Sequence, residues 1–188
     1  MMRHKHPLRY STQYSSAGFT LVELITVIVL VGILAAIAAP GWLGFINSRR
    51  ADAGKDQVLQ ILRVARAEAT RTRQGRIVEF DTATTPPTIT YRTEGAPANQ
   101  ATVYQLGQEE GIDPNYLGLR IPNGMNVTNV CTNCIAFDDQ GTIRNTVTET
   151  QPLILTVLAP RNTPSARRCV VVRTLLGAIQ TASGNTCQ

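Results

Sequence analysis

The chain has 188 residues, of which 43% are hydrophobic and 16% charged; this is the composition of a folded protein and excludes a disordered one. Its formal net charge is +5, but removal of Arg3, Lys5 and Arg9 with residues 1–18 leaves 15 basic against 13 acidic residues. Both histidines, His4 and His6, also lie in that segment, so the rest of the chain has no histidine for a triad, a general base or a metal site. Phosphate-loop and dinucleotide fingerprints are missing too. The sequence therefore predicts neither an enzyme nor a cofactor.

Residues 1–18 are polar and basic without apolar periodicity, which is typical of a processing segment that stays in the cytoplasm. From Leu24 to Ile46 no residue is charged, and a helix of this length crosses a hydrocarbon layer of roughly 30 Å. Glu23 stands at the leading end of this run, where an unpaired carboxylate costs about 2.5 to 3.5 kcal/mol at mid-bilayer depth. We predict a transmembrane and assembly helix over residues 19–46 in which Glu23 has a partner.

A second helical half is predicted over residues 47–75. Pro40, Gly41 and Gly44 predict a bend before it. Gly75 is expected to cap its end. Apolar residues recur at i, i+3, i+4, i+7 and i+11 and form a stripe that should pack on a sheet: Val58, Ile61, Leu62, Ala65 and Ala69.

Residues 76–188 are expected to form a β-rich domain, because the apolar period changes to two. Arg76 to Phe80 and Thr88 to Thr93 predict a hairpin, and residues 94–124 a long loop with short structured pieces. Asp138 to Gly141 predict a turn, since the alternating ligands of a calcium loop are missing. Further strands are predicted at Met125–Val130, Ile135–Phe137, Thr142–Arg144, Leu153–Leu158, Cys169–Arg173 and Ala178–Thr181. Strands that follow one helix indicate an α+β fold, with the long helix packed on a small antiparallel sheet.

The N-terminal residues resemble the prepilins of type IV pili and the pseudopilins of type II secretion. The shared pattern is a basic leader ending in Gly18, Phe19 as the first mature residue, Glu23 four residues later, and an unbroken apolar helix up to Pro40. The resemblance implies that a prepilin peptidase cleaves between Gly18 and Phe19 and that the new amine is methylated. It also implies that Glu23 pairs with the N-terminal amine of a neighbouring subunit. Phe19 and Glu23 are one helical turn apart, and two charges suit apolar surroundings only when each is paired.

The layout of the remaining chain resembles the minor pilin branch that includes FimT, FimU and the pseudopilin GspH. The matching parts are Arg66 to Ala69 before a glycine, the turn from Phe137 to Gly141, and the valine-rich hairpin near the C-terminus. The resemblance implies a type IV pilin-like fold and a non-enzymatic subunit that enters or primes a pilus fibre. A secretion pseudopilin and a DNA-binding minor pilin for DNA uptake are the alternatives.

The implied location is the bacterial inner membrane, crossed once, with residues 76–188 in the periplasm before assembly into a pilus or pseudopilus. The implied partners are other pilins, the prepilin peptidase, the inner-membrane assembly machinery and membrane lipid. An ordinary secretory signal is the competing interpretation, because Ala36-Ile37-Ala38 has the A-x-A form of a signal-peptidase site. An ordinary secretory signal does not require an acidic residue at the start of its apolar core. Cleavage by signal peptidase after Ala38 would also remove the apolar helix from the mature protein.

The four cysteines would lie on the extracytoplasmic side, where oxidising conditions favour disulfides. Our first choice is Cys131 with Cys134 and Cys169 with Cys187; the second bridge closes a loop of about 18 residues and contributes roughly 3 kcal/mol in the chain-entropy model. Crossed pairing is the alternative, because four cysteines allow three connectivities. A redox motif or half of a zinc site also has C-x-x-C spacing, but neither a βαβ unit nor a second C-x-x-C accompanies it.

DNA is the partner that the resemblance leaves open and the sequence does not favour. Some members of the FimT branch bind DNA through a basic Gly-Arg-x-Arg motif, and the corresponding residues here, 177–180, contain no arginine. Residues 174–188 carry no charge at all, although phosphate binding depends on Lys or Arg. The remaining candidates surround a proline-containing loop upstream: Arg161, Arg167, Arg168 and Arg173. We expect weak, salt-sensitive DNA binding.

Overall fold

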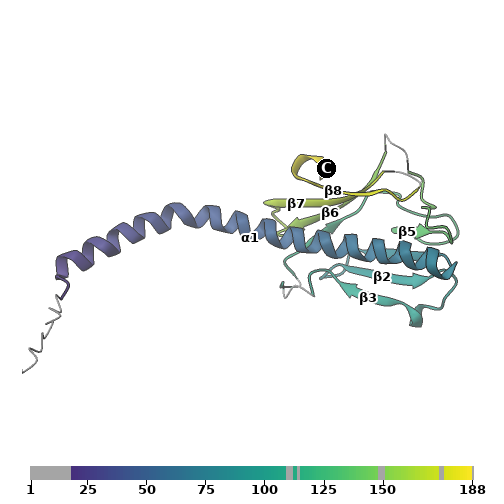
Figure 1. Ribbon diagram of the computed structural model, residues 1–188, viewed down its shortest axis with the longest axis horizontal. Helices are drawn as coiled ribbons and strands as arrows, with labels where there is room; N and C mark the ends of the chain where they lie inside the picture. The colour runs from purple at the N-terminus through teal and green to yellow at the C-terminus, as the bar shows by residue number, and fades with distance from the viewer. Residues whose placement is uncertain (1–17, 109–111, 114, 148–150, 174–175, 188) are drawn as a thin grey trace, which may run out of the picture. The chain divides into compact units, whose positions relative to one another are not determined.

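The computed structural model describes residues 18–108, 112–113, 115–147, 151–173 and 176–187. The chain divides into two compact units, Met1–Pro40 and Gly41–Gln188. One helix, α1 (Leu21–Thr72), begins in the first unit and ends in the second, and all the strands belong to the second unit (Figure 1). The predicted leader falls outside the described residues except for Gly18.

The second unit contains two antiparallel four-stranded sheets. The first sheet has the strand order β3-β2-β1-β5 and the second β4-β6-β7-β8. Two short 3₁₀ helices, η1 (Ala98–Gln100) and η2 (Gly184–Cys187), complete the elements. The strands are β1 (Arg76–Asp81), β2 (Thr88–Thr93), β3 (Thr102–Gln105), β4 (Gly118–Arg120), β5 (Cys134–Phe137), β6 (Leu153–Ala159), β7 (Ala166–Val172) and β8 (Ile179–Ser183).

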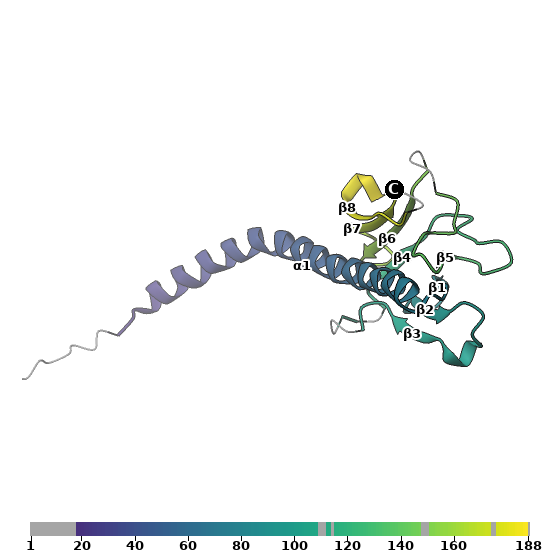
Figure 2. The same cartoon turned by 45° about the vertical axis from the view of Figure 1, so that its right-hand side comes forward.

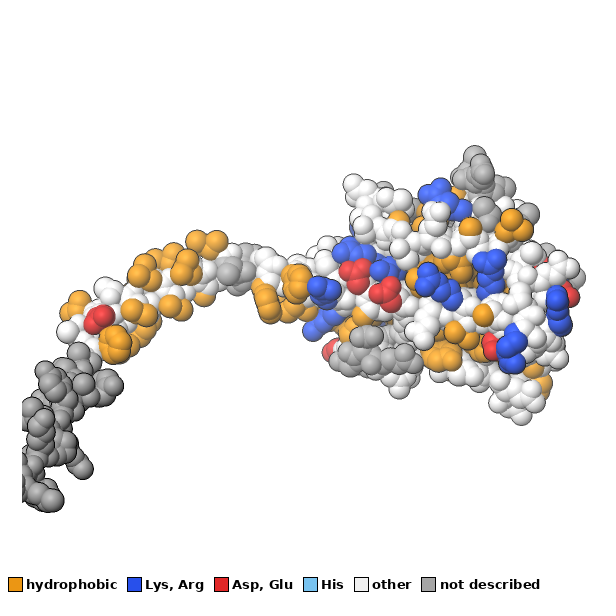
Figure 3. All heavy atoms as spheres, in the orientation of Figure 1, with side chains coloured by type: hydrophobic (Ala, Val, Ile, Leu, Met, Phe, Trp, Pro, Cys, Tyr) orange, Lys and Arg blue, Asp and Glu red, His pale blue; other side chains and the backbone are white. Residues whose placement is uncertain are grey.

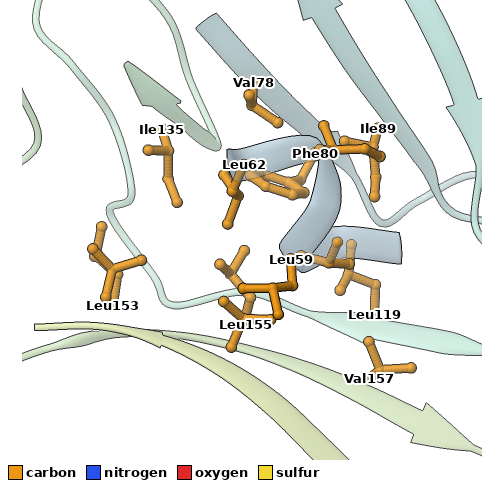
Figure 4. Packing of buried hydrophobic residues seen from close by; sticks show 14 of the residues in the cluster. Leu59, Leu62, Val78, Phe80, Ile89, Leu119, Ile135, Leu153, Leu155 and Val157 are labelled. Atoms are coloured by element: carbon orange, nitrogen blue, oxygen red, sulfur yellow. The ribbon is translucent and has the colours of Figure 1, made fainter. Parts of the chain in front are cut away.

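The C-terminal half of α1 packs into the space between the two sheets, with β2 and β3 on one side and β6 to β8 on the other (Figures 1 and 2). All five residues of the predicted apolar stripe are buried, as expected for a helix that packs on a sheet. Leu62 has no exposed surface and lies among side chains of both sheets, including Val78, Phe80 and Leu155 (Figure 4). Helix and sheets therefore share one hydrophobic core.

Each sheet also has a smaller apolar cluster on the face that points away from α1. On the first sheet Ile77 packs with Val127, Cys134 and Ala136. On the second sheet the cluster consists of Cys169, Val171 and Cys187, with Ile154 and Ala182 packed against it. Alternate residues of a strand point to opposite faces, so β1, β5, β6 and β7 contribute to both the main core and an outer cluster.

The α+β architecture with a long N-terminal helix is confirmed, and the expectation of one small sheet is corrected to two sheets. The predicted cap of the helix is also wrong. Helix α1 ends at Thr72, and Arg73 with φ 54° takes the left-handed conformation that terminates it. Gly75 instead marks a close approach, since a Cβ there would lie 2.3 Å from a carboxylate oxygen of Glu94.

The strands predicted at residues 125–130 and 142–144 are wrong. The first segment makes only one bridge, between Val127 and Cys131, because the chain turns back at Asn129 with φ 62°. The second also makes only one bridge. There the buried side chain of Asn145 accepts a hydrogen bond from the Ala136 amide and donates one to the Cys134 carbonyl, so that a side chain takes the place of a strand at this edge of β5. The other predicted strands are confirmed within a few residues, and the loop before residue 125 carries only β3, β4 and η1.

The predicted turn at Asp138 to Gly141 is confirmed, with the Gly141 amide bonded to the Asp138 carbonyl at 3.0 Å. Burial raises the pKa of the Asp138 carboxyl, but hydrogen bonds from the side chain and amide of Thr142 and from neighbouring amides outweigh it, so the pKa lies below its ordinary value. A lowered native pKa stabilises the fold above the unfolded-state pKa, and this stabilisation is lost as the pH falls through the native value.

We expect Asp138→Ala to lower the free energy of unfolding by about 1 to 2 kcal/mol at pH 7, because the amides and hydroxyl bonded to the carboxylate lose their acceptor. The difference from wild type should shrink as the pH falls below about 4. Urea unfolding as a function of pH measures both effects. The neighbouring exposed Asp139→Ala is the matched control, and an equal effect of the two substitutions would contradict this role of Asp138.

Candidate functional site

The described chain begins with Gly18 and Phe19 outside the helix, and Phe19 is 84% exposed. Helix α1 starts at Leu21, after Thr20 has capped it: the Glu23 amide donates to the Thr20 hydroxyl at 3.2 Å, and the Leu24 amide donates to the Thr20 carbonyl at 3.2 Å. The peptide bond between Gly18 and Phe19 therefore joins two exposed residues that lie outside the helix, immediately before its capped start. Such a bond is open to a protease.

The acid of this segment lies in the first turn of the helix, where a negative charge suits the helix dipole. Thr20 and Glu23 have the spacing of a capping box, in which a threonine is followed three residues later by glutamate. The sequence interpretation overlooked Thr20, although the motif T-L-V-E could have identified it. The structure thus places Phe19, Thr20 and Glu23 together at the helix start.

The rest of this helical segment has an apolar surface. Between residues 21 and 37 every large aliphatic side chain is 50% to 73% exposed (Figure 3). No single helix among the described residues is both long and apolar enough to span a membrane, but the two pieces Leu21–Ile37 and Gly41–Thr72 together meet the length and composition criteria. Apolar surface of this extent is typical of a segment that is covered by lipid or by other helices.

The four candidate DNA-contacting arginines do not share one free surface. Arg167 and Arg168 are neighbours on β7 and point to opposite faces of its sheet. The Nε of Arg168 donates to Asp52 of α1 at 2.8 Å. Burial raises the pKa of Asp52, but the bonds from Arg168 and Lys55 outweigh it and lower the pKa. Arg168 therefore serves the packing of the helix on the sheet.

Arg161 is also engaged within the domain. Its guanidinium donates to the Thr85 hydroxyl at 2.7 Å and to the Thr84 carbonyl at 3.2 Å. These bonds connect the loop after β6 with the turn between β1 and β2. Only Arg173, which is exposed, and half-buried Arg167 remain for a ligand among these four. Two arginines can make only a few contacts with the phosphates of a nucleic acid.

A family model for the prokaryotic N-terminal methylation motif matches residues 14–39. A solved structure of the type IV minor pilin FimU from Pseudomonas aeruginosa is 12% identical, with a TM-score of 0.53 over 77% of this chain and 99% of that chain. The fold is therefore type IV pilin-like. The minor pseudopilin EpsH from the Type 2 Secretion System of Vibrio cholerae is 15% identical over 71% of this chain and 97% of that chain, with a TM-score of 0.48. No curated protein sequence matches this pilin-like chain.

Both cysteine pairs of the pilin-like domain are bridged, Cys131 with Cys134 and Cys169 with Cys187, which is the pairing that the sequence analysis put first. Each bridge belongs to the outer cluster of one sheet. The Cys169–Cys187 bridge holds η2, and the Thr156 hydroxyl donates to the Cys187 carbonyl at 3.2 Å. The C-terminus is therefore attached to the second sheet by a covalent bond and a hydrogen bond.

No group of three or more His, Cys, Asp or Glu side chains suited to a metal ion occurs in the part of the pilin-like chain that the structure describes. The described domain instead offers bridged cysteines, paired charges and hydrogen-bonded loops. The candidate site of the chain is the start of α1 in the first unit, where Phe19, Thr20 and Glu23 lie together.

Proposed function

We propose that this chain is a minor type IV pilin, a membrane-anchored structural subunit that enters or primes a pilus fibre. The observation that carries the proposal is the methylation motif at residues 14–39, which includes both the Gly18–Phe19 bond and the exposed apolar start of α1. The pilin-like fold of the domain supports it. Prepilin peptidase cleaves between Gly18 and Phe19, and the Phe19 amine is then methylated.

Glu23 has the central role in assembly under this proposal. In a membrane or a fibre its charge is costly unless a cation pairs with it, and the N-terminal amine of a neighbouring subunit supplies that cation. The partners are therefore other pilins through the apolar helix, the processing peptidase and the inner-membrane assembly machinery. Before assembly the helix lies in the inner membrane and the domain in the periplasm.

The same reasoning applies to a minor pseudopilin of type II secretion, which is the alternative fibre. Isolation of surface fibres by shearing, followed by mass spectrometry, tests the proposal: a pilus subunit is recovered with the sheared fibres. Recovery only with a secretion complex would favour the pseudopilin alternative. A chain that stays with membranes in cells making both kinds of fibre would contradict a fibre subunit of either kind.

DNA binding by this domain should be weak. Arg168 and Arg161 are used within the fold, and we expect an affinity in the non-specific range, with a dissociation constant of about 10⁻⁴ to 10⁻⁶ M that weakens steeply as salt is raised. A mobility-shift titration at several salt concentrations measures this. Tight binding at physiological salt, lost in Arg167→Gln together with Arg173→Gln, would make the protein a DNA receptor. Within the part of the chain that the structure describes, neither arginine side chain donates a hydrogen bond.

A further inference from the structure

The first helical turns of the second unit expose large apolar side chains. Trp42, Leu43 and Phe45 are 64%, 63% and 51% exposed, and the rings of Trp42 and Phe45 lie against each other with centroids 6.0 Å apart. Figure 3 shows hydrophobic side chains here, followed along the helix by Lys and Arg side chains. Exposure of these side chains to water is unfavourable, so this surface is expected to have a partner.

Two arginines follow, and each contacts an aromatic ring. The guanidinium of Arg49 lies 5.1 Å from the centre of the Phe45 ring, and that of Arg50 lies 4.2 Å from the centre of the Tyr116 ring. Trp42, Phe45 and Arg49 are spaced i, i+3 and i+7, so they form one column along the helix. Arg50 lies next to this column, on the side that faces Tyr116 of the domain.

Arg49 and Arg50 bring two positive charges to this end of the domain. Among the described residues, neither Arg49 nor Arg50 has a carboxylate within ion-pair distance. The next acid along the helix, Asp52, is occupied by Lys55 at 3.1 Å and by Arg168 at 2.8 Å. Two guanidinium groups therefore remain available for an external anion.

The helix is held to the domain on another face. Asn47 is 9% exposed; its amide donates to the Ser165 hydroxyl at 2.7 Å, and its carbonyl oxygen accepts a hydrogen bond from the Tyr116 hydroxyl. Tyr116 thus both anchors Asn47 and stacks on Arg50. This arrangement fixes the column on the outside of the domain.

We propose that Trp42, Phe45, Arg49 and Arg50 form a site for the headgroup region of an anionic phospholipid membrane. Indole rings prefer the boundary between hydrocarbon and headgroups, and a guanidinium matches a phosphate group in both charge and geometry. The column rises by about 10 Å from Trp42 to Arg49, which spans the headgroup layer of one leaflet. The rings then lie at the edge of the hydrocarbon and the arginines lie among the phosphates.

The site rests on the proposed function in one respect, namely that the preceding apolar segment lies in a membrane. Chain length agrees with that placement, because Glu23 and Trp42 are 19 residues apart. In a helix this distance is about 28 Å, close to a hydrocarbon thickness of roughly 30 Å. The segment between Glu23 and Trp42 is therefore long enough to cross the hydrocarbon.

Trp42 is the single tryptophan of the chain, so its fluorescence reports on this site without a further substitution. The full mature chain is reconstituted in vesicles of phosphatidylcholine with 30% phosphatidylglycerol, and one lipid at a time is replaced by its brominated form. Lipid brominated near the headgroup should quench Trp42 more strongly than lipid brominated near the chain end. Brominated phosphatidylglycerol should quench at least about twofold more than brominated phosphatidylcholine at the same mole fraction, since each basic residue near the surface attracts anionic lipid several-fold.

The double variant Arg49→Gln/Arg50→Gln should lose this preference for the anionic lipid, and so should 0.5 M salt, which screens exposed charges. Arg49→Gln alone should reduce it, and this variant keeps the contact of Arg50 with Tyr116 on which local packing depends. Arg63→Gln/Arg120→Gln is the matched control, because it removes the same charge from exposed positions elsewhere in the domain.

Equal quenching by the two brominated lipids would overturn the lipid site. So would ready quenching of Trp42 by aqueous iodide in protein that floats with the vesicles, an outcome that would assign the column to a neighbouring protein subunit. Failure of the chain to float with vesicles would contradict the membrane anchoring itself, and the lipid site with it. Flotation thus separates the failure of the proposed function from the failure of this site.

Discussion

Replacement of Glu23 by glutamine is expected to prevent incorporation of the subunit into fibres and leave its insertion into the membrane unchanged. Insertion depends on the length of the apolar run, which the substitution does not alter. Assembly depends on the charge of Glu23, because a neutral amide leaves the amine of the neighbouring subunit unpaired in apolar surroundings. The expected loss is at least tenfold in the amount of subunit recovered from sheared fibres, equivalent to about 1.4 kcal/mol or more.

Glutamine is the informative replacement because it preserves the start of the helix. The Glu23 amide, and not its side chain, donates to the Thr20 hydroxyl, and glutamine is accepted at this position of a capping box. Thr20→Ala is the complementary variant, since it removes the cap and keeps the charge. Normal fibre incorporation of the Glu23→Gln protein would contradict the charge-pair role, whatever the Thr20 variant does.

Leu62→Ala should destabilise the domain more than any surface substitution. Leu62 is fully buried between the two sheets, and a leucine-to-alanine change in such a core costs about 2 to 5 kcal/mol because a cavity remains. The melting temperature should fall by roughly 5 to 15 °C. Near-ultraviolet circular dichroism of the full mature chain in mild detergent follows the loss of tyrosine and disulfide packing on heating.

The control for this experiment is two residues further along the same helix. Val64 is 45% exposed, so Val64→Ala removes less buried surface and leaves little cavity. A melting temperature of Leu62→Ala equal to that of Val64→Ala would mean that the sheets do not close on the helix as the structure has them.

The spacing of apolar residues predicted the helix and the main strands well, because an element that is buried on one face has apolar residues at the period of that face. The stripe that contains Leu62 is buried as predicted, and β6 and β7 lie within a few residues of their predicted positions. Both strands have apolar residues on both faces, because one face meets α1 and the other the outer cluster around Cys169. That pattern identified the strands but not the number of sheets.

The errors lie where a side chain or a single backbone conformation replaces a regular element. The side-chain amide of Asn145 forms hydrogen bonds with the backbone at the edge of β5, where a neighbouring strand was expected. The spacing of apolar residues does not predict a bond of this kind. Arg73 adopts the left-handed conformation that a nearby glycine, Gly75, was expected to take. For the candidate site, the roles of Gly18, Phe19 and Glu23 stay predictions, and the residue pattern overlooked Thr20, whose role depends on a local hydrogen bond.

The position of the mature N-terminus shows whether the chain is processed as a prepilin, and anchoring, charge pairing and assembly all depend on it. We expect intact-mass and N-terminal peptide analysis of the protein from its own cells to find Phe19 as the first residue, carrying one methyl group. In cells without prepilin peptidase the leader should remain attached. A mature chain that begins at Ala39, after the Ala36-Ile37-Ala38 sequence, would show cleavage as an ordinary secretory signal and would contradict the account.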